Sequence, residues 1–504
     1  MSVNIYPVIK TEYECNDYEV KINGEKADLN SARVSAVPFN RRWPGHQRGL
    51  EQTELINFLS ISFDEPVKFE IKPNKAFENI IIRPLNLGIT PEIKDGVISF
   101  TLDKPEYLSI EPYGRNNALH IFADPIKDYK IDKDSENVIY FGKGEYDIGS
   151  IELKSNQTLF IDEGAVVYAC IKAIDCENIK ILGHGILDNS KNKAKILFEY
   201  NAENNDCAIN NAVREHTVQI EYCENVLIDG ITIRDSLVYN IRPIACKNLH
   251  INNVKIIGCW RYNSDGIDMH NCEDVLIENC FIRTYDDSIC VKGFDCYYEG
   301  DVEKAVHEAM YRNGKAYDVF KNVLVKNCTI WNDWGKCLEI GAETRAEEIK
   351  DIIFEDCNII HVTGAVLDCC NVDYADVHNV TYRDINVEYD DIIYCPKLQT
   401  KDSEIYINPD ENYYPPLLDV QTFFHFEYSA GGDRRGICRD ITFENIHLYG
   451  KYPPKAHFSG YDESHKTHNI LIKNIYHNDN LIEKFDNNNF ELCDFTENIR
   501  YEKT

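Results

Sequence analysis

One pattern of polar and apolar positions is repeated along the C-terminal half of the chain. Each copy starts with an Asn or Asp anchor, and apolar residues follow one, three, six and eight positions later. The pattern occurs eight times between residues 225 and 477, and His477 is the residue that breaks the last apolar column. The eight anchors are Asn225, Asn248, Asp274, Asn322, Asp351, Asn379, Asp440 and Asn469.

Apolar alternation with a period of two and many β-branched residues predicts β-strands. A repeat of 23 residues (Asn225 to Asn248) or 26 residues (Asn248 to Asp274) is too short to bury its own apolar face, so each copy must stack on the next. A leucine-rich repeat would need leucine in these columns and a helical segment in every unit, but leucine is scarce there. We therefore expect an all-β chain dominated by a right-handed parallel β-helix.

The N-terminal part of the chain lacks the repeat. Short alternating stretches separated by Pro, Gly, Asn and Asp predict a small antiparallel β-sandwich over residues 1–125. Residues 126–137 are charged and without an apolar run, which predicts a linker, and residues 138–504 then form the β-helical domain. Three insertions interrupt the repeat, and loops that leave one side of a solenoid commonly wall a groove. The insertions are residues 189–216, 295–318, with a helical pattern around Val302 to Arg312, and 395–435.

Composition narrows the range of partners. The chain has 504 residues, 43% of them hydrophobic, with a net charge of −31, so nucleic acid and anionic membrane surfaces are disfavoured. No basic segment followed by an apolar stretch opens the chain, and no run of about 18 apolar residues occurs. We expect a cytoplasmic protein without a membrane partner, and a homo-oligomer is compatible with the sequence.

The cysteines do not predict a disulfide framework or a metal centre. There are 19, an odd number, and Cys280, Cys328 and Cys357 fall in an inward column of the repeat. In that column they are small buried hydrophobes. No CxxC pair is present, so the sequence predicts neither a structural metal nor a cofactor.

Two acidic stretches depart from the repeat consensus. Asp265 lies two residues before Ile267, and Asp287 lies two residues before Ile289, so the two acids occupy one column on consecutive turns. Neighbouring strands are about 4.8 Å apart, so these acids and Asp286 should crowd into one outward-facing patch. Crowding should raise at least one carboxyl pKa. Stacked turn residues are the structural alternative.

An aromatic and basic cluster accompanies the acids. Lys336 falls at the equivalent position on the next turn, where a cation would relieve the repulsion and hold a sugar hydroxyl. Exposed aromatic rings would offer flat faces to sugar rings, although a single Trp is more often a core residue. Paired carboxylates of unequal pKa beside a groove are what glycoside hydrolysis requires. The cluster consists of Trp260, Arg261, Tyr262, Tyr285, Lys292, Trp331 and Trp334.

These motifs resemble those of the β-helical glycoside hydrolases of the polygalacturonase and dextranase clan. The shared pattern is Asn-x-Asp followed about twenty residues later by Asp-Asp, matched by Asn263, Asp265, Asp286 and Asp287. Residues 117–125 resemble the junction between sandwich and coil in dextranase-type members. The resemblance implies that Asp286 is the general acid and that Asp265 and Asp287 activate water for hydrolysis with inversion.

The departures from the family pattern concern the substrate. Where polygalacturonases carry Gly-His-Gly and Arg-Ile-Lys, this chain has Gly335-Lys336-Cys337 and approximately Leu367-Asp368-Cys369. The clamp for a uronate carboxylate is missing, which favours a neutral oligosaccharide, while a pectic substrate is the alternative. Glu339 or Arg345 is expected to touch substrate. Residues 40–48, rich in Arg, either reach over the groove or join the two domains.

Two other functional classes remain open from the sequence. A polysaccharide lyase or sugar epimerase on the same scaffold would use clustered acids for calcium together with an Arg or Lys base. A non-catalytic carbohydrate-binding solenoid would bind glycans without turnover. The identity of the sugar, its linkage and the choice of endo or exo cleavage do not follow from the sequence.

Overall fold

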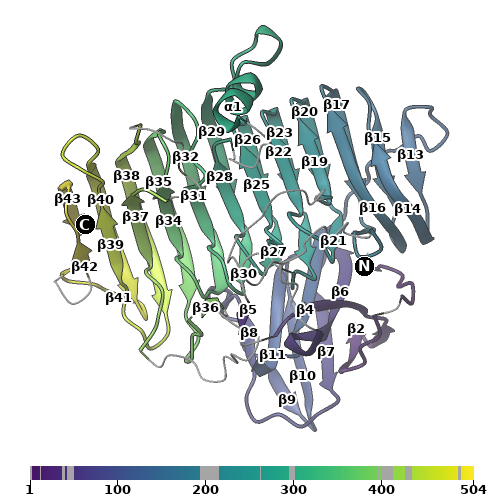
Figure 1. Ribbon diagram of the computed structural model, residues 1–504. Coiled ribbons are helices and arrows are strands. Elements are labelled where there is room, and N and C mark those ends of the chain that lie inside the picture. The colour runs from purple at the N-terminus through teal and green to yellow at the C-terminus, as the bar shows by residue number, and fades with distance from the viewer. Residues whose placement is uncertain are drawn as a thin grey trace.

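The structure is a computed structural model, and it has a β-sandwich followed by a long parallel β-helix, as the repeat pattern predicts (Figure 1). The residues that it describes are 3–11, 13–36, 40–41, 50–192, 215–261, 263–294, 301–395, 397–398, 412–425, 429, 434–485 and 490–503.

Two sheets form the N-terminal sandwich, and most of their strand pairs are antiparallel. Strand β12 runs parallel to β6, which departs from a purely antiparallel arrangement. One sheet contains β1 (Val3–Ile5), β6 (Thr53–Phe63), β12 (Leu119–Pro125), β11 (Tyr107–Arg115), β8 (Ile81–Arg83) and β4 (Asn30–Ser35). The other contains β3 (Glu25–Ala27), β2 (Tyr18–Ile22), β7 (Val67–Pro73), β10 (Val97–Leu102) and β9 (Glu92–Lys94). A separate short pair joins β5 (Asn40–Arg41) to β36 (Lys397–Leu398).

The coil starts with β13 (Val138–Phe141), β14 (Gly144–Glu152) and β16 (Ala165–Ile174), after which its strands stack into three faces. The first face contains β15 (Thr158–Ile161), β17 (Glu177–Gly183), β20 (Glu224–Asp229), β23 (Lys247–Asn252), β26 (Glu273–Glu278), β29 (Val319–Lys326), β32 (Glu348–Glu355), β35 (Asp376–Glu388), β38 (Ile437–Tyr449), β40 (Thr467–His477) and β43 (Thr496–Glu502). The second contains β18 (Ile186–Asp188), β21 (Thr232–Arg234), β24 (Lys255–Ile257), β27 (Phe281–Thr284), β30 (Thr329–Asn332) and β33 (Asn358–His361). The third contains β19 (Val218–Glu221), β22 (Ile241–Ile244), β25 (Ile267–His270), β28 (Ile289–Lys292), β31 (Leu338–Ala342), β34 (Leu367–Asn371), β37 (Leu418–Thr422), β39 (Ala456–Ser459) and β42 (Phe490–Leu492).

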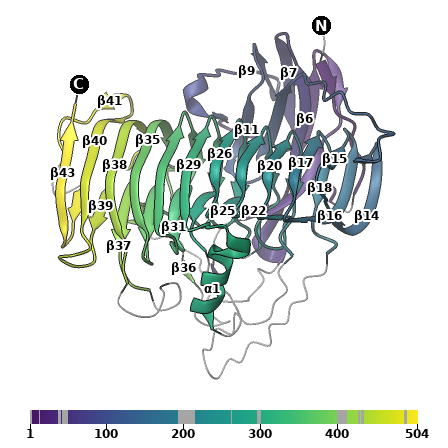
Figure 2. The ribbon, with the colours of Figure 1, turned by 90° about the horizontal axis from the view of Figure 1, so that it is seen from above.

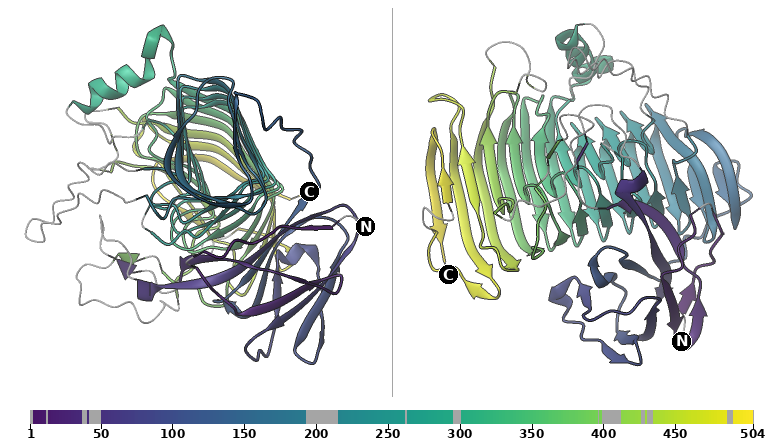
Figure 3. Two further views of the ribbon diagram at one scale, coloured as in Figure 1. Left: turned by 90° about the vertical axis from the view of Figure 1, so that its right-hand side faces the viewer. Right: turned by 60° about the horizontal axis from the view of Figure 1, so that its bottom comes forward.

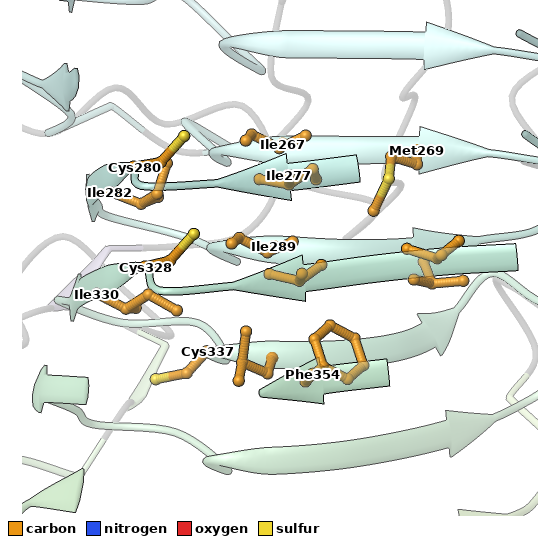
Figure 4. Packing of buried hydrophobic residues seen from close by; sticks show 14 of the residues in the cluster. Ile267, Met269, Ile277, Cys280, Ile282, Ile289, Cys328, Ile330, Cys337 and Phe354 are labelled. Carbon is orange, nitrogen blue, oxygen red and sulfur yellow. The ribbon is translucent and has the colours of Figure 1, made fainter. Parts of the chain in front are cut away.

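The apolar columns of the repeat line the inside of the coil. Ile277, Cys280 and Ile282 are fully buried, as are Cys328 and Ile330 one turn later (Figure 4). The inward position predicted for the repeat cysteines is therefore confirmed. Because successive side chains of a strand point to opposite faces, residues next to these columns are left on the outside.

The anchor residues hold the turns in register. Asn225, Asn248 and Asp274 adopt left-handed φ values of 58°, 53° and 58°, a conformation that Asn and Asp tolerate. Their side chains form a ladder in which the Asn248 amide donates to Asn225 Oδ1 at 2.6 Å and the Asn322 amide donates to Asp274 Oδ1 at 2.9 Å. Each rung of the ladder fixes one coil against the next.

The sandwich packs along the flank of the coil, against its second face (Figure 3). Phe58 and Phe122 of the sandwich share an apolar cluster with Phe281 and Trp331 of the coil. A buried ionic contact adds to this cluster, since Arg83 of the sandwich pairs with Glu111 at 3.1 Å and also with Glu388 of the coil. The described strands of the third face do not contribute to this shared cluster.

A helix follows the third-face strand β28. It is α1 (Val302–Met310), in the predicted helical stretch, and it projects from the coil (Figure 2). Val306 and Met310 pack on Ile244 and Ala245 at the end of β22. Short 3₁₀ turns occur at Leu50–Gln52, Leu85–Leu87 and Arg312–Gly314, and β41 (Asn480–Leu481) is a final short strand. Among the described residues, no helix is long and apolar enough to cross a membrane.

The inward column should dominate stability. Ile282→Ala removes a fully buried side chain between two stacked coils, and we expect the free energy of unfolding to fall by about 2–5 kcal/mol. Leu492→Ala is the matched control, since Leu492 is 49% exposed and should change stability little. Urea unfolding followed by circular dichroism measures both, and equal midpoints for the two variants would contradict this packing.

Candidate active site

Strand register brings the predicted acids together at the turn that leads into the third face. Gly266 N donates to Asp287 O at 2.8 Å, and Ile267 N donates to Ser288 O at 2.9 Å. Residues 265 and 287 therefore stack on consecutive coils, as their spacing predicts. Ser288 N donates in turn to Lys336 O at 2.8 Å, so Lys336 does occupy the equivalent position on the following coil.

A buried polar scaffold fixes these turns. The Asn332 amide donates to Asp286 O at 2.7 Å and to Lys336 O at 3.1 Å, which ties two successive turns together. Thr284 Oγ1 also donates to Asp286 O at 2.7 Å. Gly335 lies so close to the acidic turn that a Cβ atom there would be 2.5 Å from Asp287 N. Only glycine fits that position without displacing Asp287.

Lys292 is the cation at the centre of the acids. Its Nζ lies 3.6 Å from Asp265 Oδ2, 3.8 Å from Asp287 Oδ2, 3.4 Å from Asp268 Oδ1 and 3.5 Å from Glu343 Oε2. The sequence interpretation gave this charge-relieving place to Lys336, whose ammonium pairs instead with Glu339 and Asp368 and interacts with Asp287 less strongly. Lys292 lies on the outward side of β28, so its ammonium reaches the acids of the neighbouring turns.

Burial and mutual repulsion change the protonation of the acids. Asp265 and Asp286 are only 2% and 6% exposed, so the patch is more enclosed than its outward position suggests. Burial, with repulsion from Asp268 and Asp286, raises the pKa of Asp265 well above its usual range. Burial and repulsion from Asp287 do the same to the pKa of Asp286. Asp287 is the acid of the three that reaches solvent, with 18% of its side chain exposed.

Lys336 supports the site in another way. Its main-chain N–H donates to Asp287 Oδ1 at 2.9 Å, and this bond orients the carboxylate. Its ammonium contacts Glu339 Oε1 on the same coil and Asp368 Oδ2 on the next coil, each at 2.8 Å. The charge of Lys336 is thus balanced by two acids of the third face.

Those two acids begin a row along the outside of the third face. Strand pairing aligns Glu339 with Asp368 and Asp368 with Asp419. Burial raises the pKa of Asp368 to about 7, with repulsion from Asp419 adding to the effect and Lys336 opposing it. Burial and Asp287 raise the pKa of Glu339 well above its usual range. The carboxyl groups of the row offer several hydrogen-bonding atoms. Lys336, the cation next to them, is already paired with two of these acids.

Two of the predicted substrate-binding side chains are committed elsewhere. Trp260 is 7% exposed and its indole N–H donates to Asp235 Oδ1 at 3.0 Å. Arg261 pairs with the same Asp235 and stacks over the Trp260 ring at 4.2 Å. Asn263 occupies a turn with a φ of 54°, which explains the residue type without a ligand. Tyr262 and residues 42–49 lie outside the described residues.

The remaining predicted aromatic and basic residues are mostly buried. Trp331 is fully buried against Arg283, 3.8 Å from its ring, so it is a core residue, the alternative given above for any single Trp. Trp334 is half-buried and stacks on Tyr285 with ring centroids 5.6 Å apart. Arg345 donates through Nε to Asp373 Oδ2 at 2.7 Å and reaches Glu303 of helix α1 at 3.7 Å. Arg345 therefore anchors an insertion.

Sequence reasoning missed three side chains around Lys292. Asp268 is fully buried, and its Oδ1 lies 3.4 Å from the Lys292 ammonium. Glu343 pairs with Lys292, and the Tyr239 ring lies 5.3 Å from the Lys292 ammonium. Period-two alternation places Asp268, next to the inward Ile267, on the outside of the coil. That alternation could have identified Asp268 as a site residue. Tyr239 comes from a loop without such a pattern.

The chain is similar in sequence to a family of known proteins. Residues 146–400, just over half of the 504-residue chain, match the family model described as glycosyl hydrolases family 28. A polygalacturonase of Gossypium barbadense is 27% identical over 233 residues, 44% of this chain and 53% of that protein. An exopolygalacturonase of Oenothera organensis is 24% identical over 207 residues, 38% of this chain and 53% of that protein. The chain thus spans about half the length of these curated relatives.

A solved structure extends the likeness to both domains. Dex49A from Penicillium minioluteum aligns with 100% of this chain and 94% of its own, with 13% sequence identity and a TM-score of 0.55. At this identity the likeness concerns the fold alone. It confirms the expected β-helix with its N-terminal domain, while the family model confirms the polygalacturonase-type resemblance drawn from the motifs.

The raised pKa of Asp368 predicts a pH-dependent difference in stability. A carboxyl whose folded pKa lies above its unfolded value stabilises the fold at low pH, and this contribution is lost as pH rises towards about 7. Stability of the wild type should therefore fall between pH 5 and 7 more steeply than that of Asp368→Asn, by at most about 1.4 kcal/mol per pH unit. Urea unfolding at three pH values tests this. Parallel curves for the two proteins would contradict a raised pKa.

Proposed function

Since the chain belongs to glycosyl hydrolases family 28, we propose that it hydrolyses glycosidic bonds with inversion at the acidic turn of the third face. The observation that carries this proposal is the convergence of Asp265, Asp286 and Asp287 around one buried lysine. Inverting hydrolysis needs one protonated acid and a carboxylate that activates water.

The surroundings of the three acids divide these roles. Lys292 forms ion pairs with Asp265 and Asp287, so these two carboxyls are placed to act together on the attacking water. Burial and repulsion from Asp287 raise the pKa of Asp286 and favour its protonated form, which suits this residue to the role of general acid. Asp286 then protonates the leaving oxygen, and Asp265 with Asp287 removes a proton from the attacking water. The proton taken from the water restores the acid in the next cycle.

A neutral oligosaccharide is the substrate class that the row Glu339, Asp368 and Asp419 supports best. Carboxylates and carboxylic acids both hydrogen-bond to sugar hydroxyls, whereas recognition of a uronate carboxylate calls for a cation. Lys336, the cation beside this row, is already held by Glu339 and Asp368. This supports hydrolysis of an uncharged chain.

Polygalacturonate is the second candidate. It is favoured by the relatives, which include proteins named polygalacturonase and exopolygalacturonase. A galacturonate carboxylate would require a cation to bind it, and Lys292 beside the acidic turn is a cation at this place. The two candidates differ in the charge of the sugar that lies on the third face.

One experiment tests both the reaction and its substrate. The protein is incubated with neutral and galacturonate oligosaccharides, and proton NMR identifies the first anomer released. We expect the inverted anomer from a neutral oligosaccharide, and Asp286→Asn should lower turnover at least about 100-fold because the general acid is lost.

The matched control is Asp274→Asn, because Asn occupies the same anchor column in other coils and accepts the same ladder bond. This variant should retain wild-type turnover. Release of the retained anomer, or full turnover in Asp286→Asn, would refute the mechanism. Hydrolysis of galacturonates alone would replace the neutral substrate with the second candidate.

A further inference from the structure

Three side chains of metal-binding type converge at the C-terminal end of the third face. His457 on β39 aligns by strand pairing with Glu491 on β42, and Cys493 follows β42 directly. One ligand atom from each of the three lies within 4.8 Å of the others. This cluster is four strands beyond the acidic turn on the same face, and it borders the end of the acidic row at Asp419.

The distances fit a tetrahedral ion. Zinc bonds of about 2.0–2.1 Å to nitrogen and about 2.3 Å to sulfur, at a tetrahedral angle, put the two ligand atoms about 3.5 Å apart. His457 Nε2 and Cys493 Sγ are 3.5 Å apart. Cys493 Sγ and Glu491 Oε1 are 4.0 Å apart, so the carboxylate needs only a small side-chain movement to complete the set.

A neighbouring acid fixes the imidazole in the orientation that a metal requires. His457 Nδ1 contacts Asp419 Oδ1 at 2.9 Å, so Nε2 is left facing Cys493. A carboxylate on the distal nitrogen is the usual partner of a metal-bound histidine, and it sets both the tautomer and the ring orientation. Gln421 donates to the same Asp419 oxygen at 2.7 Å and holds that carboxylate in place. The three side chains that could bind the metal are therefore supported by two further residues, Asp419 and Gln421, which hold His457 in place.

Two further groups of side chains among the described residues could offer ligand atoms to a metal ion, but their surroundings suit a cation less well. Glu348, Asp376 and His378 also converge, but Arg439 already neutralises Asp376 at 2.8 Å and Lys350 pairs with Glu348. Asp287, Cys290 and Glu339 belong to the candidate active site. Glu491, by contrast, pairs with no Lys or Arg among the described residues. It is therefore available to a cation.

We propose that His457, Glu491 and Cys493 bind one Zn²⁺ ion, with Asp419 orienting the histidine. Nitrogen, oxygen and sulfur donors together select zinc over calcium or magnesium, which prefer oxygen alone. Cys493 binds as the thiolate and releases its proton to solvent. The ion joins β39 to the last coil and leaves a fourth position for water.

The test titrates the whole protein, freed of metal by a chelator and kept reduced, with Co²⁺ and with Zn²⁺. Co²⁺ reports sulfur ligation by its thiolate charge-transfer absorption, and Zn²⁺ affinity is measured against a chromogenic chelator. We expect one site per chain and loss of the Co²⁺ band in Cys493→Ser. Asp419→Asn should weaken Zn²⁺ binding about 10- to 100-fold.

Two controls separate this site from incidental binding. Cys15→Ser and His468→Ala change the same residue types elsewhere, and both should bind as the wild type does. Glu491 is exposed, so Glu491→Gln tests the site even if His457→Ala fails to fold. Absence of stoichiometric binding, or an unchanged Co²⁺ band in Cys493→Ser, would overturn the proposal.

Discussion

In-register stacking of parallel strands is the constraint on which the candidate active site depends. Pairing aligns Ile267 with Ile289 and Ile289 with Leu338, and the acids of the turns follow that alignment. A slip of one residue would turn Lys292 towards the core and Val291 towards solvent. The buried columns and the anchor ladder both oppose such a slip, so the same repeat that builds the coil also positions the chemistry.

Confinement of like charges gives the site its reactivity. Removing an ion from water costs several kcal/mol even after the protein relaxes, so buried acids stay ionised only beside a cation. Lys292 serves several acids at distances of 3.4–3.8 Å and cannot neutralise all of them. Burial and this shortage of positive charge raise the pKa values of Asp265, Asp268 and Asp286. Neighbouring acids in unequal surroundings are what general acid–base catalysis uses.

The sequence predicted what depends on local repetition. Counting from the repeat was sufficient to stack Asp265 on Asp287 and to bury Cys328, because strand alternation and coil length determine both. It did not predict the partner of Lys336, whose ammonium bends away from the acidic turn to Glu339. Nor did it predict that Trp331 lies beneath the sandwich, because that burial depends on how two domains pack, and no residue spacing encodes it.

The protonation of the acidic turn is the most direct test of this account. Carbon-13 NMR of a protein labelled at the aspartate carboxyl carbon would follow each titration, with Asp265→Asn and Asp286→Asn used for assignment. The account predicts that signals assigned to these two residues titrate well above the ordinary aspartate range of about 3–5. Ordinary acidic titration of both would mean that the carboxyls are solvated and apart, which would contradict the proposed site.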